Sequence, residues 1–253
     1  MDGTKQIAIE SGKNRVFVVA SPSRVLSSVS DIQIELGGKT IKASRSVKNL
    51  GVTFDRSMNM SIHIGNLCKI VNFHIRNLWR IRRFITKEAC HHAVRSLVLS
   101  RIDYANSLLF GAREADLKRL QRLQNKAARL VFACGRDRCS DELINSLHWL
   151  QVKDRIYFKL MLYVYKCIMN VAPSYLHDLI TLFSDTLTVG NRHRLRSSSD
   201  TTRLSVPRSR KRAGDHSFLV AAPRLWNELP IQLREAVSVP VFKRLLKTHL
   251  YKC

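Results

Sequence analysis

Apolar residues recur every three or four positions from Met60 to Ile85, and this stripe limits the fold more than any other feature of the sequence. Such spacing places the apolar side chains on one face of an amphipathic α-helix. Asp55 or Ser57 is expected to cap this helix, because an oxygen of either side chain can accept a hydrogen bond from a free backbone N–H. The stripe consists of Met60, Ile64, Leu67, Val71, Ile75, Leu78, Ile81 and Ile85.

Further helices are predicted after this first one. A second is expected between Thr86 and Gly111, and a third from about Ala115 to Ala133, with Gly135 as its C-terminal stop. In the second helix, the residues expected to face inward are Ala89, Ala93, Leu97 and Val98. Shorter helices are predicted after Ser140 and over residues 154–170, 175–183, 217–229 and 240–251.

The first 55 residues have a different pattern, which favours strands. Runs of β-branched and aromatic residues occupy positions 6–9, 16–19 and 32–36. Gly37-Gly38 predicts a hairpin turn into residues 39–42, and Val47–Phe54 predicts one further strand. The expected fold class is therefore mainly α, with a helical bundle and a C-terminal helical region, preceded by a small β-hairpin.

Positive charge is the second constraint. The chain has 43 Lys plus Arg against 19 Asp plus Glu, a formal net charge of +24. Such an excess repels itself unless a polyanion is present, which indicates DNA, RNA or an anionic membrane surface as a partner. The excess is concentrated between residues 56 and 135, where 15 Lys or Arg stand against four Asp or Glu.

Two of the predicted helices carry a row of cations opposite the apolar stripe. The first row consists of Lys69, Arg76, Arg80 and Arg83, and the second of Lys118, Arg122, Lys126 and Arg129. Like charges at positions i and i+4 repel by roughly 0.2–0.5 kcal/mol, but a row of phosphates would turn this repulsion into attraction. The alternative is a solvated helix face, although such a face usually also contains glutamates.

A second basic region lies in residues 184–215, which lack apolar periodicity and are predicted to form a loop or linker. Its candidate nucleic-acid contacts are Arg208, Arg210, Lys211 and Arg212. The string Ser209–Arg212 also resembles a nuclear-localisation signal, although basic runs of four residues are common.

The sequence offers little for catalysis or metal binding. It has no adjacent pair of aspartates, no Gly-rich phosphate loop and no His-Glu-x-x-His motif, so neither enzymatic activity nor a cofactor is expected from these residues alone. Cys134, Cys139 and His148 come closest to a zinc site, but a structural zinc ion needs four ligands. The adjacent His91 and His92 would point about 100° apart on a helix and could not chelate together.

The expected location is the nucleus or the cytoplasm, without secretion or membrane insertion. No apolar run approaches the ~18–20 residues that span a bilayer, and the N-terminus lacks the pattern of a secretory signal. Six cysteines are scattered through the predicted helical stretches, which is typical of reduced thiols.

Nine sequence blocks carry more information than composition does. They are Lys48–Asp55, His63-Ile64, Leu99–Gly111, Leu120–Leu130, Leu147–Leu150, Ala172–Leu176, Leu195–Ser197, Ala222–Pro230 and Phe242–Leu250. In this order the blocks resemble the C-terminal part of the reverse transcriptases of non-LTR retrotransposons, the LINE elements of jockey-like type. Any single block would be a weak signal.

The resemblance implies a domain order and a function. Residues 1–55 correspond to the end of the palm with its primer-grip hairpin, in which Leu50 and Gly51 lie near the primer end. Residues 56–135 correspond to a helical thumb that grips a template–primer duplex or an RNA–DNA hybrid. Two C-terminal helical regions, 136–183 and 216–253, are then separated by the basic loop 184–215.

The resemblance also implies what this chain lacks. The family's fingers, palm aspartates and endonuclease would lie upstream of Met1, so the chain is expected to be a truncated copy that binds nucleic acid without extending it. Magnesium ions are then expected only in the intact parent enzyme. Lys5 matches the palm lysine only in part, because Thr4-Lys5-Gln6 departs from the family's residue order. Two alternatives stay open: a host-adopted helical module that binds protein, and a translated remnant without function.

Overall fold

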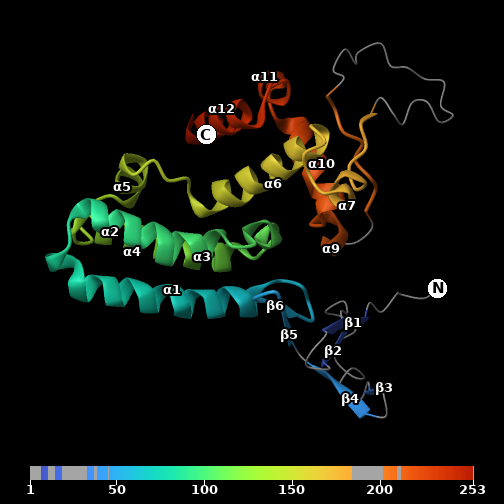
Figure 1. Cartoon of the computed structure of the whole chain (residues 1–253), viewed down its shortest axis with the longest axis horizontal. Helices are drawn as coiled ribbons and strands as arrows, with labels where there is room; N and C mark the ends of the chain where they lie inside the picture. The colour runs from blue at the N-terminus through green and yellow to red at the C-terminus, as the bar shows by residue number, and fades with distance from the viewer. Residues whose placement is uncertain are drawn as a thin grey trace. The chain divides into compact units, whose positions relative to one another are not determined.

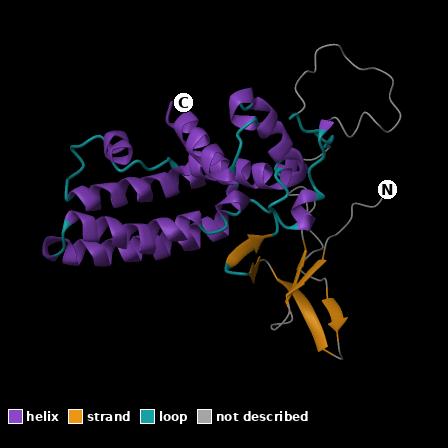
Figure 2. Ribbon diagram, turned by 45° about the horizontal axis from the view of Figure 1, so that its top comes forward, coloured by secondary structure: helices purple, strands orange, loops and turns teal. Residues whose placement is uncertain are grey.

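The structure, a computed structural model, describes residues 7–10, 15–18, 33–36, 39–44, 46–183, 202–209 and 212–252 (Figure 1). These residues are mainly helical, and strands β1–β6 precede the helices (Figure 2). The predicted fold class, mainly α with a small β-hairpin before the helices, is confirmed. The chain divides into two compact units, Met1–Leu143 and Ile144–Cys253.

Two small sheets form the N-terminal part of the first unit. The larger sheet has four strands. In order across the sheet they are β1 (Ile7–Glu10), β2 (Arg15–Val18), β4 (Lys39–Ser44) and β3 (Gln33–Leu36). β3 and β4 are antiparallel and pair Leu36 with Lys39, so the hairpin predicted across Gly37-Gly38 is confirmed. The two glycines themselves lie outside the described residues.

The smaller sheet is an antiparallel hairpin of β5 (Ser46–Asn49) and β6 (Val52–Asp55). The single strand predicted over Val47–Phe54 is therefore wrong. Leu50 and Gly51 form the turn with φ angles of 45° and 82°, and two positive φ values in succession match the twist of the flanking strands. Because leucine seldom adopts a positive φ, this turn has only a weak signal in the sequence.

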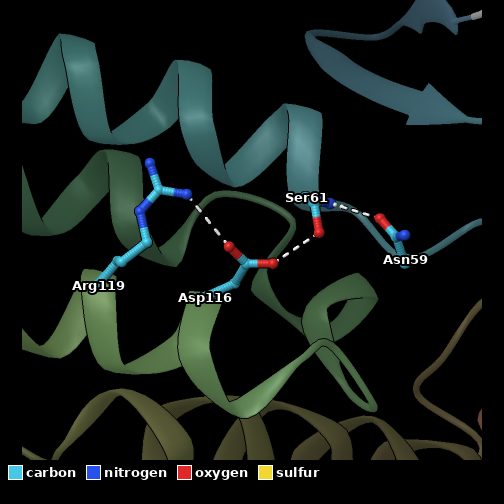
Figure 3. A network of polar contacts seen from close by, with 4 residues as sticks. All are labelled: Asn59, Ser61, Asp116 and Arg119. Atoms are coloured by element: carbon cyan, nitrogen blue, oxygen red, sulfur yellow. Dashed lines mark hydrogen bonds and ion pairs between the residues drawn. The ribbon is translucent and has the colours of Figure 1, made fainter.

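Helix α1 (Ser61–Ile81) begins after the predicted capping residues. The side chain that accepts a hydrogen bond from the first turn is that of Asn59, and not that of Asp55 or Ser57. Asn59 Oδ1 accepts from the Ser61 N–H at 3.0 Å (Figure 3). Asp55 Oδ1 instead accepts from the Asn59 N–H at 3.2 Å, which holds the connection from β6. The predicted apolar stripe is buried from Met60 to Leu78, including Ile64, Leu67, Val71 and Ile75, but Ile81 at its end is exposed.

Helices α1 and α4 (Glu114–Phe132) lie side by side and run parallel (Figure 1). At their first turns, the Ser61 hydroxyl donates to Asp116 Oδ2 at 2.6 Å. At their last turns, Arg82 in η2 (Arg82–Phe84) donates from Nε and Nη2 to the carbonyls of Leu130 and Val131, at 2.8 and 2.9 Å. Ala133 ends α4 in a left-handed conformation, two residues before the predicted stop at Gly135.

The chain between these two helices returns antiparallel to them, since the Lys87 ammonium at its start lies 4.1 Å from the centroid of the Phe132 ring at the end of α4. Its elements are α2 (Lys87–Val94), the π-helical turn η3 (Arg95–Leu99), α3 (Ser100–Asp103) and η4 (Asn106–Leu109). The second predicted helix begins at Thr86 as expected, and Thr86 caps α2 by accepting a hydrogen bond from the Ala89 N–H at 3.2 Å.

The buried face of this returning segment differs from the predicted one. Cys90 and Val94 are buried, whereas Ala89 and Leu97 are exposed. Ala93 is half-buried, so of the four residues predicted to face inward only Val98 is buried. Val98, Leu99 and Ile102 follow in the core, since the π-helical turn adds a residue and lets two neighbours face inward.

The second unit has an aromatic core. Its helices are α6 (Val152–Ile168), α7 (Ser174–His177), α9 (Arg212–Asp215), α10 (Phe218–Glu228), α11 (Ile231–Arg234) and α12 (Val239–Lys252), and α5 (Ser140–Ser146) crosses the boundary between the units. The rings of Tyr165 and Phe242 stack with centroids 4.2 Å apart, and Trp226 lies 5.9 Å from Phe242. The Tyr165 hydroxyl donates to the Ala236 carbonyl at 2.6 Å, so this buried ring keeps a polar partner.

Part of the predicted linker 184–215 packs into this core. Leu204 is 2% exposed, and its backbone N–H and carbonyl both bond the Asn227 side chain, at 2.9 and 2.8 Å. The Trp226 indole N–H donates to the Thr202 carbonyl at 2.8 Å. Residues 184–201 lie outside the described residues.

Candidate nucleic-acid interface

Helix α1 presents its predicted row of cations to solvent. Lys69, Arg76 and Arg80 are exposed, on the side away from the buried stripe. Arg83 is exposed in η2, with its guanidinium 4.6 Å from the centroid of the Phe84 ring. Among the described residues, no carboxylate forms a salt bridge with any of these four cations. Their charges can therefore interact with an external polyanion.

Helix α4 exposes three of the four cations of its row. Lys118, Arg122 and Lys126 are exposed, opposite the buried face of the helix. Arg129 is different because it is half-buried and its Nη2 donates to the Ser140 hydroxyl. The Nε atom of Arg129 is buried and has no hydrogen-bond partner among the described residues. Arg129 is thus partly engaged in the fold, and the other three are the freely exposed cations of α4.

The two rows meet in one depression of about 620 Å³ between α1, α4 and the residues that follow α4. We call it the helix groove. Five cations line it: Arg76, Arg122, Lys126, Arg129 and Arg136. The other lining residues are Asn72, Ile75, Trp79, Asn125, Cys134 and Gly135, and none of the lining residues is acidic. A concave site lined by one sign of charge concentrates the potential and attracts anions.

The remaining predicted cations do not line the helix groove. Arg80, Arg83 and Lys118 are exposed elsewhere on the first unit. Lys69 lines a second depression of about 710 Å³ beside the β5–β6 turn, which we call the hairpin groove. The row predicted along α1 is therefore divided between two grooves and the open helix surface.

The hairpin groove includes the predicted primer-grip residues. Gly51 lines it, and the neighbouring Leu50 has a side chain that is 82% exposed. The Tyr104 hydroxyl donates to the Leu50 carbonyl at 2.7 Å, which fixes the turn against the end of α3. The cations that line this groove are Lys48, Lys69 and Arg101, and its lining again lacks a carboxylate.

His63 connects the hairpin to α1 at the floor of this groove. Its Nδ1 accepts a hydrogen bond from the Thr53 N–H at 3.3 Å, so the neutral tautomer carries its proton on Nε2. Burial lowers the pKa of His63, because desolvation disfavours the charged imidazolium. A neutral imidazole can keep accepting this bond, whereas a protonated one cannot.

Several residues of the two grooves were missed by the sequence analysis. These are Trp79 and Arg136 in the helix groove, and Lys48, Arg101 and Tyr104 in the hairpin groove. A signal for one of them was present, because Trp79 stands between two basic residues of the α1 row in the sequence. The others come together only through packing of segments that are distant in the chain.

The structure does not place the second basic region as a cluster. Arg208 is exposed in the described segment 202–209, and Arg212 begins α9. Arg210 and Lys211 lie outside the described residues. The structure therefore gives no evidence that these residues form part of the candidate interface.

Within the described ranges, no group of three or more His, Cys, Asp or Glu could hold a metal ion. Cys134 is half-buried in the helix groove and Cys139 is exposed, both as free thiols. Burial raises the pKa of the Cys68, Cys90 and Cys167 thiols above the ordinary value. None of the described helices has both the length and the apolar character needed to cross a bilayer.

Comparisons with protein-family models, with curated proteins and with solved structures find no match for this chain. The family resemblance of the nine sequence blocks therefore stays a prediction. The geometry of the two grooves is the independent basis for inferring what the chain does.

Proposed function

We propose that the first unit, Met1–Leu143, binds nucleic acid through the cations of α1 and α4, as a thumb-like part related to a retrotransposon reverse transcriptase. The proposal assigns binding of a template–primer duplex or hybrid to this chain and assigns it no polymerisation. Its sequence has no adjacent pair of aspartates, so it offers no such pair to hold the two metal ions of polymerase chemistry.

One observation carries the proposal: cations from two parallel helices converge on a groove that is lined by no carboxylate of the described residues. Folding gains little from gathering Arg76, Arg122 and Lys126, because like charges in proximity destabilise the folded state. Phosphates placed against them would remove this repulsion and release the counterions of the nucleic acid. Clusters of like charge that lower the stability of the folded state are common at binding sites, where a bound partner offsets the repulsion.

The hairpin groove supports the same proposal at the other end of α1. Lys48, Lys69 and Arg101 surround the Leu50–Gly51 turn, which Tyr104 holds in place. A strand whose phosphates contact these cations would bring its end next to the exposed turn, as the primer-grip resemblance implies. The bend of the turn is fixed by the left-handed backbone at both residues.

The test reverses four charges on the full chain and measures binding of a labelled hybrid duplex over a range of salt. The variant Arg76→Glu, Arg80→Glu, Lys118→Glu, Arg122→Glu should bind much more weakly, and the slope of log K against log salt should fall by roughly 0.9 for each lost phosphate contact. The matched control reverses Lys153, Lys243, Arg244 and Lys247, four exposed cations of the second unit. Both variants change the net charge equally.

A lower affinity and a flatter salt dependence for the first variant alone would support the proposal. Equal weakening by both variants would contradict it, because binding would then follow net charge and not these helix faces. Binding of acidic proteins that survives nuclease treatment, without any binding of nucleic acid, would favour the interaction module instead.

A further inference from the structure

Trp79 stands out in the helix groove because it is a large aromatic residue that folding leaves at the surface. It is 43% exposed, whereas the chain's other two tryptophans, Trp149 and Trp226, are 5% and 0% exposed. The indole N–H of Trp79 has no hydrogen-bond partner among the described residues, in contrast to that of Trp226. Leaving an indole exposed gives up the burial free energy that aromatic rings usually contribute.

The surroundings of Trp79 combine three kinds of chemistry. Arg76, Arg122, Lys126 and Arg136 provide cations in the same groove. Asn72 and Asn125 add two carboxamides, and the Asn125 Oδ1 accepts from Gln121 Nε2 at 2.8 Å, which leaves its amide N–H groups as the donors. An aromatic ring, amide donors and a cluster of cations match the base face, the base edge and the phosphates of a nucleotide.

We infer that the helix groove binds an unpaired segment of nucleic acid, with one base stacked on the Trp79 ring and the adjacent phosphates held by Arg122, Lys126 and Arg136. In the interior of a duplex both faces of each base are covered by neighbouring base pairs, whereas an unpaired base can turn one face to a protein ring. The volume of about 620 Å³ lies in the range of sites that enclose small ligands, so it suits one or two nucleotides. This inference rests on the proposed function and adds that an unpaired segment next to the duplex is what enters the helix groove.

The position of Trp79 provides a specific optical test. Because the other two tryptophans are buried, a stacked base should quench the emission of Trp79 alone. Full-length protein would be titrated with a labelled oligothymidylate, a blunt duplex and inorganic polyphosphate, with binding followed by anisotropy of the label and quenching by tryptophan emission. Oligothymidylate should quench strongly, whereas the duplex and the base-free polyphosphate should bind with little quenching.

Two variants of Trp79 separate stacking from general binding. Trp79→Ala should lower the affinity for oligothymidylate roughly tenfold or more, as expected when one stacked base is lost. Trp79→Phe should keep most of the affinity, because it keeps a ring, and should abolish the quenching. Phe84→Ala is the matched control, since Phe84 is a 72% exposed aromatic of η2 that does not line the groove.

The outcomes distinguish this inference from the function on which it rests. Oligothymidylate that binds without quenching, or with an affinity unchanged in Trp79→Ala, would overturn base stacking and leave nucleic-acid binding intact. Equal quenching by the blunt duplex would overturn the requirement for an unpaired base. Absence of any binding at low salt would overturn the proposed function itself.

Discussion

The two units differ in where they place their tryptophans, and each has arginines that its own fold uses. In the second unit Tyr165, Trp226 and Phe242 form the core, and Arg234 is buried with its Nε donating to the Leu229 carbonyl at 3.1 Å. In the first unit Trp79 and the cations of α1 and α4 face solvent. Rings and charges that serve folding are buried and hydrogen-bonded. Those left exposed and unpaired in the first unit are better explained by a partner.

The largest expected effect tests whether the second unit depends on its aromatic core. Trp226→Ala removes a fully buried ring and its hydrogen bond to Thr202, and should lower the free energy of unfolding by about 3–5 kcal/mol. Urea unfolding followed by circular dichroism would measure this loss. Oligonucleotide binding by the first unit should persist. Weakened binding in a variant whose first unit is still folded would contradict the separation of roles.

A smaller effect separates a structural arginine from exposed ones within the first unit. Arg82 donates to three carbonyls, those of Leu130, Val131 and Ile85, so Arg82→Met should lower the free energy of unfolding by about 2–3 kcal/mol. Arg80→Met is the matched control and should change it by less than about 0.5 kcal/mol, because Arg80 is exposed.

The two variants should have the opposite ranking when nucleic-acid binding is measured in place of stability. Arg80→Met should reduce the salt slope of nucleic-acid binding by roughly 0.9, whereas Arg82→Met should leave the slope unchanged. The measurement is the same salt series for both variants at a temperature where each is folded. A slope lowered by Arg82→Met alone would mean that the exposed row is not the contact surface.

The smallest expected effect is a pH dependence of the first unit's stability. Burial lowers the pKa of His63, His74 and His91, so each stays neutral in the folded state at a pH where the unfolded chain already binds a proton. The stability of this unit should therefore be complete above pH 6.5, the ordinary histidine value, and decline as the pH falls below it.

His63→Gln isolates one contribution to this decline. The glutamine side chain can accept the hydrogen bond from the Thr53 N–H but does not titrate. Urea unfolding at pH 7.5 and pH 5 should give a smaller difference for the variant than for the natural chain. An equal difference would exclude His63 as a source of the acid sensitivity.

Local patterns in the sequence predicted the helices well. An apolar stripe with the period of a helix identifies an amphipathic helix without reference to the rest of the chain. Thus α1 buries its expected stripe as far as Leu78, and α4 buries its own apolar face. The prediction was wrong where the backbone departs from regular geometry. The positive φ of Leu50 turns the expected strand into a hairpin, and the π-helical turn at Arg95–Leu99 changes which residues face inward.

The candidate site was predictable only in part, for a related reason. Each cationic row follows from the period of its own helix, but the meeting of Arg76 with Arg122 depends on how α1 packs on α4. The bond between Tyr104 and Leu50 likewise joins residues that are 54 positions apart. No local pattern encodes such contacts, because they depend on the tertiary fold.

The parallel packing of α1 and α4 has an electrostatic consequence. Every α-helix is a dipole with a partial positive charge at its N-terminus and a partial negative one at its C-terminus, so two parallel neighbours place like poles together. Asp116, paired with Arg119 at 3.2 Å, supplies a negative charge where both N-termini meet (Figure 3). Arg82 supplies a positive charge where α4 ends. These two side chains act as opposite counter-charges, and neutralising either would remove about 0.3–1 kcal/mol of stabilisation at that pole alone.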